Sequence, residues 1–131
     1  MHLKKAANWS KKQDHLLFRF ISALGIALFL TTFANAETIA PREAAQNIGS
    51  YETVEGVVSQ VSKSRGGTTF INFGGRFPNH VFYAVIFKKY AHKFQSLDRL
   101  VGKSVAISGT IDLYKGKPQI ILFSPDQIVQ R

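Results

Sequence analysis

Five stretches of the chain have hydrophobic patterns typical of β-strands: some mix apolar with polar positions, and the stretch at 80–87 is nearly continuous in apolar residues. The stretches are rich in valine, isoleucine, threonine and phenylalanine and are separated by glycine- and proline-containing turns. They span residues 51–62, 68–73, 80–87, 103–114 and 119–123. The predicted fold class is therefore mainly β.

Two further segments change to a helical period. Tyr90, Phe94, Leu97 and Val101 recur at helical spacing with polar residues between them, which predicts one amphipathic helix over 88–100. Within 38–48, Pro41 is followed by an acidic residue and the segment ends at Gly49, which predicts a short helix near the N-terminal end of the domain.

A short pattern that occurs twice in the sequence favours a closed barrel over a flat sheet. Residues 49–58 align with residues 102–111, and each copy has a glycine in the middle of its strand, Gly56 and Gly109. A glycine inside a strand marks a bend, a bulge or a close backbone approach. Three strands, a helix and two more strands are the plan of the OB-fold, a five-stranded Greek-key barrel with a helix between strands three and four.

Several segments also resemble OB-fold families directly. They are VEGVV at 54–58, TFINFG at 69–74, AVI at 84–86, LVGKSV at 100–105 and GKPQII at 116–121. The chain resembles bacterial OB-fold nucleic-acid-binding domains, which include small exported OB proteins and the anticodon-binding domains of the aspartyl-tRNA synthetase class. The resemblance implies that Phe70 stacks on a base. Asn72 stands where those anticodon-binding domains have Asp, and Gly74 where they have Arg.

The N-terminal segment predicts export. Five lysine and arginine residues precede an apolar run at 20–33, and Ala34-Asn35-Ala36 supplies small residues at a cleavage site. This is the layout of a secretory signal peptide at 1–36, with an OB-fold domain at 37–131 that is periplasmic or secreted after cleavage between Ala36 and Glu37. An uncleaved membrane anchor is the alternative, but the run is shorter than the roughly 20 residues that span a bilayer.

Charge and cysteine content narrow the class of partner. Residues 37–131 have 12 lysine and arginine residues against 7 acidic ones, and the chain has no cysteine. An exported domain without disulfides depends on packing for its stability. A net charge of +5 on a domain of this size favours polyanions, although it could also serve solubility alone.

Most of the nine candidate binding residues follow from the OB plan, in which ligands lie on strands two and three between the loops that join strands one–two and four–five. Arg76 is added because it lies in the predicted loop between strands two and three beside Phe77, where a cation next to an exposed aromatic ring can clamp a base, although Phe77 could instead close the end of the barrel. Flexible basic loops suit a phosphate backbone, and aromatic side chains on the sheet suit bases. The candidates are Lys63, Arg65, Phe70, Asn72, Arg76, Tyr83, Tyr114, Lys115 and Lys117. Phe70 could instead be covered by the N-terminal helix, and Tyr83 and Tyr114 could belong to the rim of the core.

No motif supports catalysis or a cofactor. The acidic residues are scattered, whereas glycosidases need two facing carboxylates and two-metal nucleases need an acidic cluster. The two histidines of 37–131, His80 and His92, lie in different predicted elements, so no metal site is expected.

These observations predict an exported, non-catalytic OB-fold module without cofactors that binds single-stranded nucleic acid through basic loops and aromatic stacking. The alternative is an exported OB module for a protein partner, an anionic glycan or a small molecule, since the same face serves those ligands.

Overall fold

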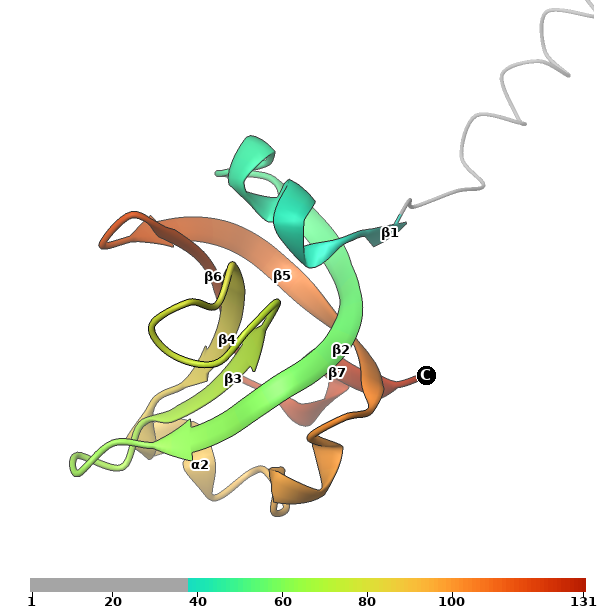
Figure 1. Cartoon of the computed structure of the whole chain (residues 1–131). Coiled ribbons are helices and arrows are strands. Elements are labelled where there is room, and N and C mark those ends of the chain that lie inside the picture. Colours follow the sequence, from blue (N-terminus) through green and yellow to red (C-terminus); the bar gives the residue numbers. More distant parts are fainter. Residues whose placement is uncertain (1–37) are drawn as a thin grey trace, which may run out of the picture. The chain divides into compact units, whose positions relative to one another are not determined.

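Strands dominate residues 38–131, the part of the chain that the computed structural model describes (Figure 1). The seven strands of this part are β1 (Thr38–Ile39), β2 (Tyr51–Lys63), β3 (Thr69–Phe73), β4 (Phe82–Ile86), β5 (Ser104–Tyr114), β6 (Lys117–Ile121) and β7 (Ile128–Gln130). Its helical elements are the 3-10 helices η2 (Pro41–Gln46), η3 (Asp98–Leu100) and η4 (Pro125–Gln127) and the α-helix α2 (Lys88–Ala91). The predicted signal peptide lies outside the described residues. None of the helices within 38–131 has the length and apolar character that crossing a membrane requires.

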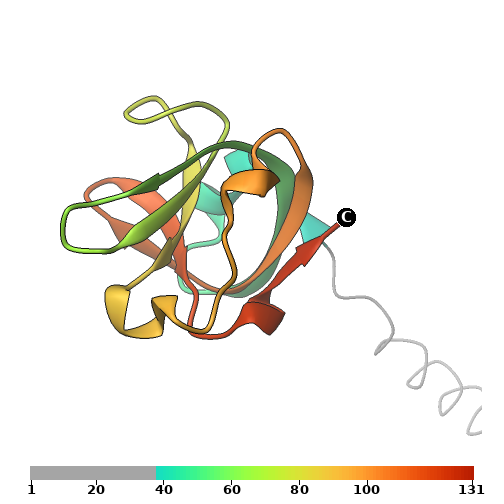
Figure 2. The same cartoon turned by 90° about the horizontal axis from the view of Figure 1, so that it is seen from below.

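The strand pairings within residues 38–131 form a closed cycle. β2 pairs with β3, β3 with β4, β4 with β6, β6 with β5, and β5 returns to β2. Only the β4–β6 pair of this cycle is parallel. Figure 2 shows these strands curving around one interior.

The expectation of five strands was wrong in number, because β1 and β7 also pair. β1 adds to β2 in parallel, and β7 adds to β5 in antiparallel orientation. These segments of two and three residues are too short to show an alternating pattern in the sequence.

Within the closed cycle the two longest strands, β2 and β5, each pair with two partners, and the two strand glycines lie where the partner changes. β2 pairs with β5 through Val57 and with β3 from Val58 onward, just after Gly56. β5 pairs with β2 through Thr110 and with β6 from Ile111 onward, just after Gly109. Each glycine therefore lies where its strand passes from one partner strand to the next.

Both glycines also face the packed interior. A Cβ built at Gly56 would lie 2.6 Å from Cγ of Pro41, and one built at Gly109 would lie 2.5 Å from Cγ2 of Ile120. Such distances are far below van der Waals contact, so neither position has room for a larger side chain.

The interior is filled by alternate residues of the paired strands. Its buried members include Val54, Val58, Ile71, Phe73, Phe82, Ala84, Ile86, Val105, Ile107, Ile111, Ile120 and Leu122. Phe73 and Phe82 lie opposite each other in the β3–β4 register, with their ring centroids 5.4 Å apart. Ile71 and Phe73 thus face the core as predicted, which leaves Phe70 on the outer side of β3.

The helix predicted over 88–100 is wrong as a single element. Only Lys88–Ala91 is α-helical, and the chain then runs irregularly to the 3-10 turn Asp98–Leu100. Tyr90, Phe94 and Leu97 still pack against the core. The helical spacing of these apolar residues therefore indicates that they anchor the segment, but three anchors do not require a continuous helix when packing outweighs local propensity.

The N-terminal helix is present as the 3-10 helix Pro41–Gln46. Pro41 occupies its first turn, and Oε1 of Glu43 accepts a hydrogen bond from the backbone N–H of Ala40 at 3.1 Å. Its one buried residue, Ala44, packs into the core and places Pro41 against Gly56.

Candidate functional site

The outer face of β3 and β4 carries a hollow of about 460 Å³. It is bounded by the β2–β3 loop on one side and the β5–β6 turn on the other, and both project from the same side of the sheet (Figure 1). The lining residues are Ser62, Lys63, Ser64, Phe70, Asn72, Phe77, His80, Tyr83, Tyr114, Lys115 and Lys117. Seven of the nine predicted site residues are among them. Arg65 and Arg76, both exposed in loops, are not.

Four rings form a row along the floor and edge of this hollow. Phe70 lies 6.0 Å from Tyr83 between ring centroids, Tyr83 lies 5.3 Å from His80, and His80 lies 5.9 Å from Phe77. The Phe77 and His80 rings are stacked, and the His80 and Tyr83 rings meet edge to face. Phe77 and His80 were not among the predicted site residues.

Exposure separates the rings that can meet a ligand from those that support them. Phe77 is 72% exposed and Tyr114 is 53% exposed, while Phe70 is partly buried. Tyr83 is buried at 6% exposure. Of the two predictions for Tyr83, a ring on the binding face or a residue at the rim of the core, this burial fits the second. Tyr83 forms part of the floor, with the rings of Phe70 and His80 beside its own.

Asn72 is also buried, at 2% exposure, and acts on the protein itself. Its Nδ2 donates to Oε1 of Gln60 at 3.0 Å, and the same oxygen accepts from the backbone N–H of Phe77 at 2.8 Å. Asn72 thus holds Gln60, and Gln60 holds the loop that presents Phe77. Neither the burial of Asn72 nor the role of Gln60 could be inferred from the alternating pattern, which predicts a side chain's face but not its partners.

Lys117 was predicted to belong to a phosphate-binding rim, but in the structure it holds a loop in place. Its Nζ donates to the carbonyl oxygens of Pro78, at 2.6 Å, and His80, at 2.5 Å. These bonds tie the β5–β6 hairpin to the β3–β4 loop across 39 and 37 residues of sequence. The ammonium is consequently engaged with the loop rather than free at the rim.

Lys115 and Lys63 remain at the edge of the hollow as exposed cations. Lys115 has a φ of 48° in the β5–β6 turn, and its Nζ lies 5.4 Å from the centroid of the Tyr114 ring. This places an ammonium beside an exposed aromatic face, a combination that suits a base with its phosphate.

The floor of the hollow is uncharged at neutral pH. Burial, and secondarily the charge of Lys117, lower the pKa of His80 below its usual 6.5, and Nδ1 of this imidazole is buried without a hydrogen-bond partner among residues 38–131. Burial, and secondarily Tyr114, raise the pKa of Tyr83 above its usual 10.0. Among the residues that the structure describes, no acidic side chain lines the hollow, so its electrostatic character is set by the lysines at its edge.

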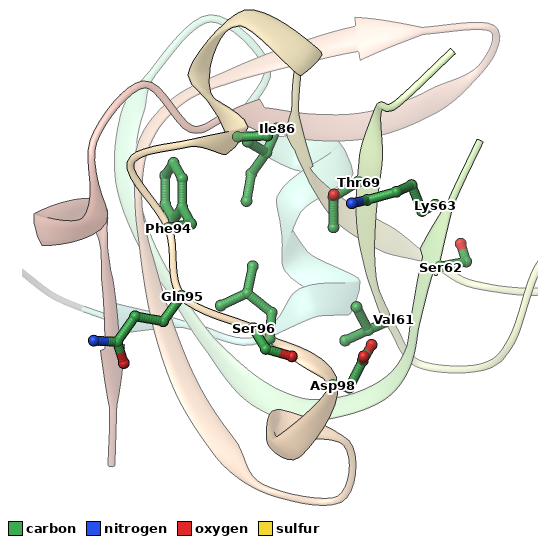
Figure 3. A pocket seen from close by; sticks show the side chains of 11 residues that line it. Val61, Ser62, Lys63, Thr69, Ile86, Phe94, Gln95, Ser96 and Asp98 are labelled. Carbon is green, nitrogen blue, oxygen red and sulfur yellow. The ribbon is translucent and has the colours of Figure 1, made fainter. Parts of the chain in front are cut away.

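A second hollow, of about 430 Å³, opens at the ends of β2, β3 and β4 (Figure 3). Val61, Ile86 and Phe94 form its apolar side, and the irregular segment after α2 crosses its edge. The irregular segment between α2 and η3 contributes Phe94, Gln95, Ser96 and Leu97 to its lining. Of the predicted site residues only Lys63 lines it, so Lys63 borders both hollows.

The described part of the chain has no evident metal-binding site. Residues 38–131 contain no group of three or more histidine, cysteine or acidic side chains placed to hold an ion.

Comparisons by sequence give no relatives. No protein-family profile matches the chain, so the resemblance to small exported bacterial OB proteins has no support from a family. No curated protein matches it either.

Comparisons by structure give similar folds. A solved structure described as OBody AM1L10 bound to hen egg-white lysozyme is 18% identical, covers 76% of this chain and 98% of its own, and has a TM-score of 0.54. A putative aspartyl-tRNA synthetase from Leishmania major Friedlin is 12% identical over 76% of this chain, and an asparaginyl-tRNA synthetase from Pyrococcus horikoshii is 15% identical over 73% of it. Both synthetase matches have a TM-score of 0.49, and this chain covers 21% and 23% of their lengths. The likeness to the OBody structure is one of fold alone and does not extend to a ligand.

Proposed function

We propose that this domain is a non-catalytic OB-type module that binds single-stranded nucleic acid, largely without sequence preference, across the outer face of β3 and β4. The closed cycle of β2, β3, β4, β6 and β5 is the five-stranded Greek-key barrel of this proposal, with β1 and β7 as additions at its edges.

The observation that carries the proposal is the composition of the larger hollow. Exposed and partly exposed rings from three separate chain segments converge there, and the charged side chains around them are all lysines. Single-stranded nucleic acid needs this combination, because each base offers an apolar face and each phosphate a negative charge.

Roles follow from exposure and bonding. Phe77, Tyr114 and the exposed part of Phe70 are the stacking surfaces, each contributing about 1–3 kcal/mol per base. Lys63 and Lys115 contact phosphates at the edge of the hollow, and Arg65 extends this edge along the β2–β3 loop. Asn72, Gln60 and Lys117 hold the loops in place without touching the ligand.

The proposal includes export. The basic N-terminal residues, the apolar run and the Ala34-Asn35-Ala36 site support cleavage before Glu37. N-terminal sequencing of the protein recovered from its native host tests this. A first residue of Glu37 is expected, and a chain that retains Met1 in the membrane fraction would contradict export of a free domain.

The binding proposal is tested by fluorescence anisotropy with a labelled oligothymidylate at about 50 mM and about 200 mM salt, a range over which phosphate-dependent binding weakens strongly. Affinity should fall steeply as salt rises, and Lys115→Gln should flatten that dependence by about 0.7 in the slope of log K against log salt. Lys103→Gln, which removes the charge of an exposed lysine that lines neither this hollow nor the second one, is the matched control.

Absence of binding at the lower salt concentration would contradict the proposal. The same face would then be assigned to a protein partner, an anionic glycan or a small molecule.

A further inference from the structure

Positive charge is concentrated in one part of the sequence beyond what the hollow uses. Between Glu55 and Asp98 there are six lysine and arginine residues and no acidic residue. This stretch contains the end of β2, the strands β3 and β4, and α2. Lys88, Lys89 and Lys93 belong to it and line neither the larger hollow nor the second one.

The side chain of Lys88 connects α2 to the loop that borders the hollow. A Cβ built at Gly67 would lie 3.1 Å from both Cγ and Cδ of Lys88, so the lysine stem packs on the β2–β3 loop. That loop carries Arg65 and follows Lys63, the last residue of β2. Figure 2 shows the loop and α2 next to each other at the same end of the sheet. The basic surface therefore continues from the edge of the hollow onto α2.

An aromatic pair stands beside these lysines. The Tyr90 and Phe123 rings meet edge to face at 5.1 Å between centroids, and Phe123 is 47% exposed. Nζ of Lys89 and Nζ of Lys93 lie 5.0 Å and 5.4 Å from the centroid of the Tyr90 ring. Rings flanked by ammonium groups repeat the chemistry of the hollow.

Both ammonium groups belong to exposed lysines near one ring, Lys89 within α2 and Lys93 two residues after its end. None of the residues of this patch is acidic. The patch therefore favours an anionic ligand with an aromatic part.

We propose that the patch formed by Lys88, Lys89, Lys93, Tyr90 and Phe123, the α2 patch, is a second subsite for the same nucleic-acid strand. This inference rests on the proposed function. A strand too long for the hollow continues past Lys63 and Arg65, over Lys88, and onto Phe123, with its phosphates beside Lys89 and Lys93.

Strand length gives the test. Binding of the purified full chain is measured with oligothymidylates of about 5 and about 15 nucleotides, which bracket the usual footprint of an OB-fold. The variant is the triple substitution Lys88→Gln, Lys89→Gln and Lys93→Gln. The matched control removes three cations that line neither hollow, Arg42→Gln, Lys103→Gln and Arg131→Gln.

The α2-patch variant should weaken binding of the longer strand by about tenfold or more and lower its salt slope by about 2, because each phosphate neutralised on a single strand adds about 0.7 to that slope. It should leave the shorter strand almost unchanged, and so should the control variant for both strands. Arginine at the same three positions should restore binding of the longer strand, which separates charge from folding.

Equal affinity of the variant and the control for the longer strand would overturn the inference. So would an equal loss for both strand lengths. If the parent protein binds neither strand, the proposed function itself fails, which is a distinct result.

Discussion

The wall made by the paired halves of β2 and β5 and the face made by β3 and β4 use alternating strand residues for opposite purposes. In the wall, the inward positions Gly56 and Gly109 are so crowded that Pro41 and Ile120 occupy the space of a side chain. On the face, outward rings leave a hollow of about 460 Å³. The wall is closely packed because of its two inward glycines. The face is incompletely packed because of its outward rings.

This difference predicts whether a substitution should change the stability of the domain or its binding. A change in the wall alters how the chain folds, because its neighbours cannot move away. A change at an exposed ring of the face alters only what the surface can contact, because the ring contributes little to the interior. Substitutions in the two regions can therefore test this separation.

The largest effect is expected in the wall. Gly56→Val and Gly109→Val should each lower the free energy of unfolding by about 3 kcal/mol or more, since the new side chain meets the Pro41 ring or a core isoleucine below contact distance. Chemical denaturation of the purified protein measures this. Gly66→Val is the control, because a Cβ there would meet only Oγ of Ser64 at 3.8 Å. Unfolding curves that coincide with those of Gly66→Val would show that the two glycines are dispensable.

The second effect tests which lysine of the β5–β6 hairpin is structural. Lys117→Met should lower the free energy of unfolding by about 2 kcal/mol, because it leaves two carbonyls of the β3–β4 loop without their charged donor. Lys115→Met, two positions away and exposed, should change it by less than about 0.5 kcal/mol. Denaturation curves of the pair decide the matter, and equal stability would return Lys117 to the phosphate rim.

Much of the β3–β4 face could be predicted, because strand alternation and the order of the elements determine on which side of the sheet a side chain lies. They do not determine how deeply that side chain is buried. The strand predicted at 51–62 is observed as Tyr51–Lys63, and the strand predicted at 68–73 as Thr69–Phe73. Phe70 and Lys63 therefore line the same hollow, as expected.

The rest depended on contacts between distant parts of the chain. Tyr83 and Asn72 lie on the predicted side of their strands but are covered by Phe70, His80 and Gln60. Lys117 bonds to carbonyls nearly forty residues away, and no local pattern indicates such a partner. The helix over 88–100 failed for the same reason, since Phe94 and Leu97 reach the core from an irregular segment.

The third prediction compares two exposed rings, one on the face and one on the wall. Phe77→Ala should weaken binding of single-stranded oligonucleotide by about 1–3 kcal/mol with an unchanged salt slope, because stacking is not ionic. Tyr51→Ala removes a ring that is 70% exposed on β2, close to the 72% of Phe77, and should leave affinity unchanged. Anisotropy titrations give both values. Equal loss in the two variants would mean that exposed rings contribute without regard to their position.

The smallest effect concerns the pH dependence of stability. Because burial lowers the pKa of His80 in the folded protein below its usual 6.5, the unfolded chain takes up the proton first as pH falls. The stabilisation from a neutral His80 is complete above that value and is lost as pH falls through it towards the folded pKa. His80→Gln should therefore flatten the decline in the free energy of unfolding between about pH 7.5 and about pH 5.5. His92→Gln, which replaces an exposed histidine after α2, should keep the slope of the parent. Denaturant titrations across this pH range measure the slopes, and identical slopes for the parent and His80→Gln would show that the face does not hold its imidazole in the neutral form.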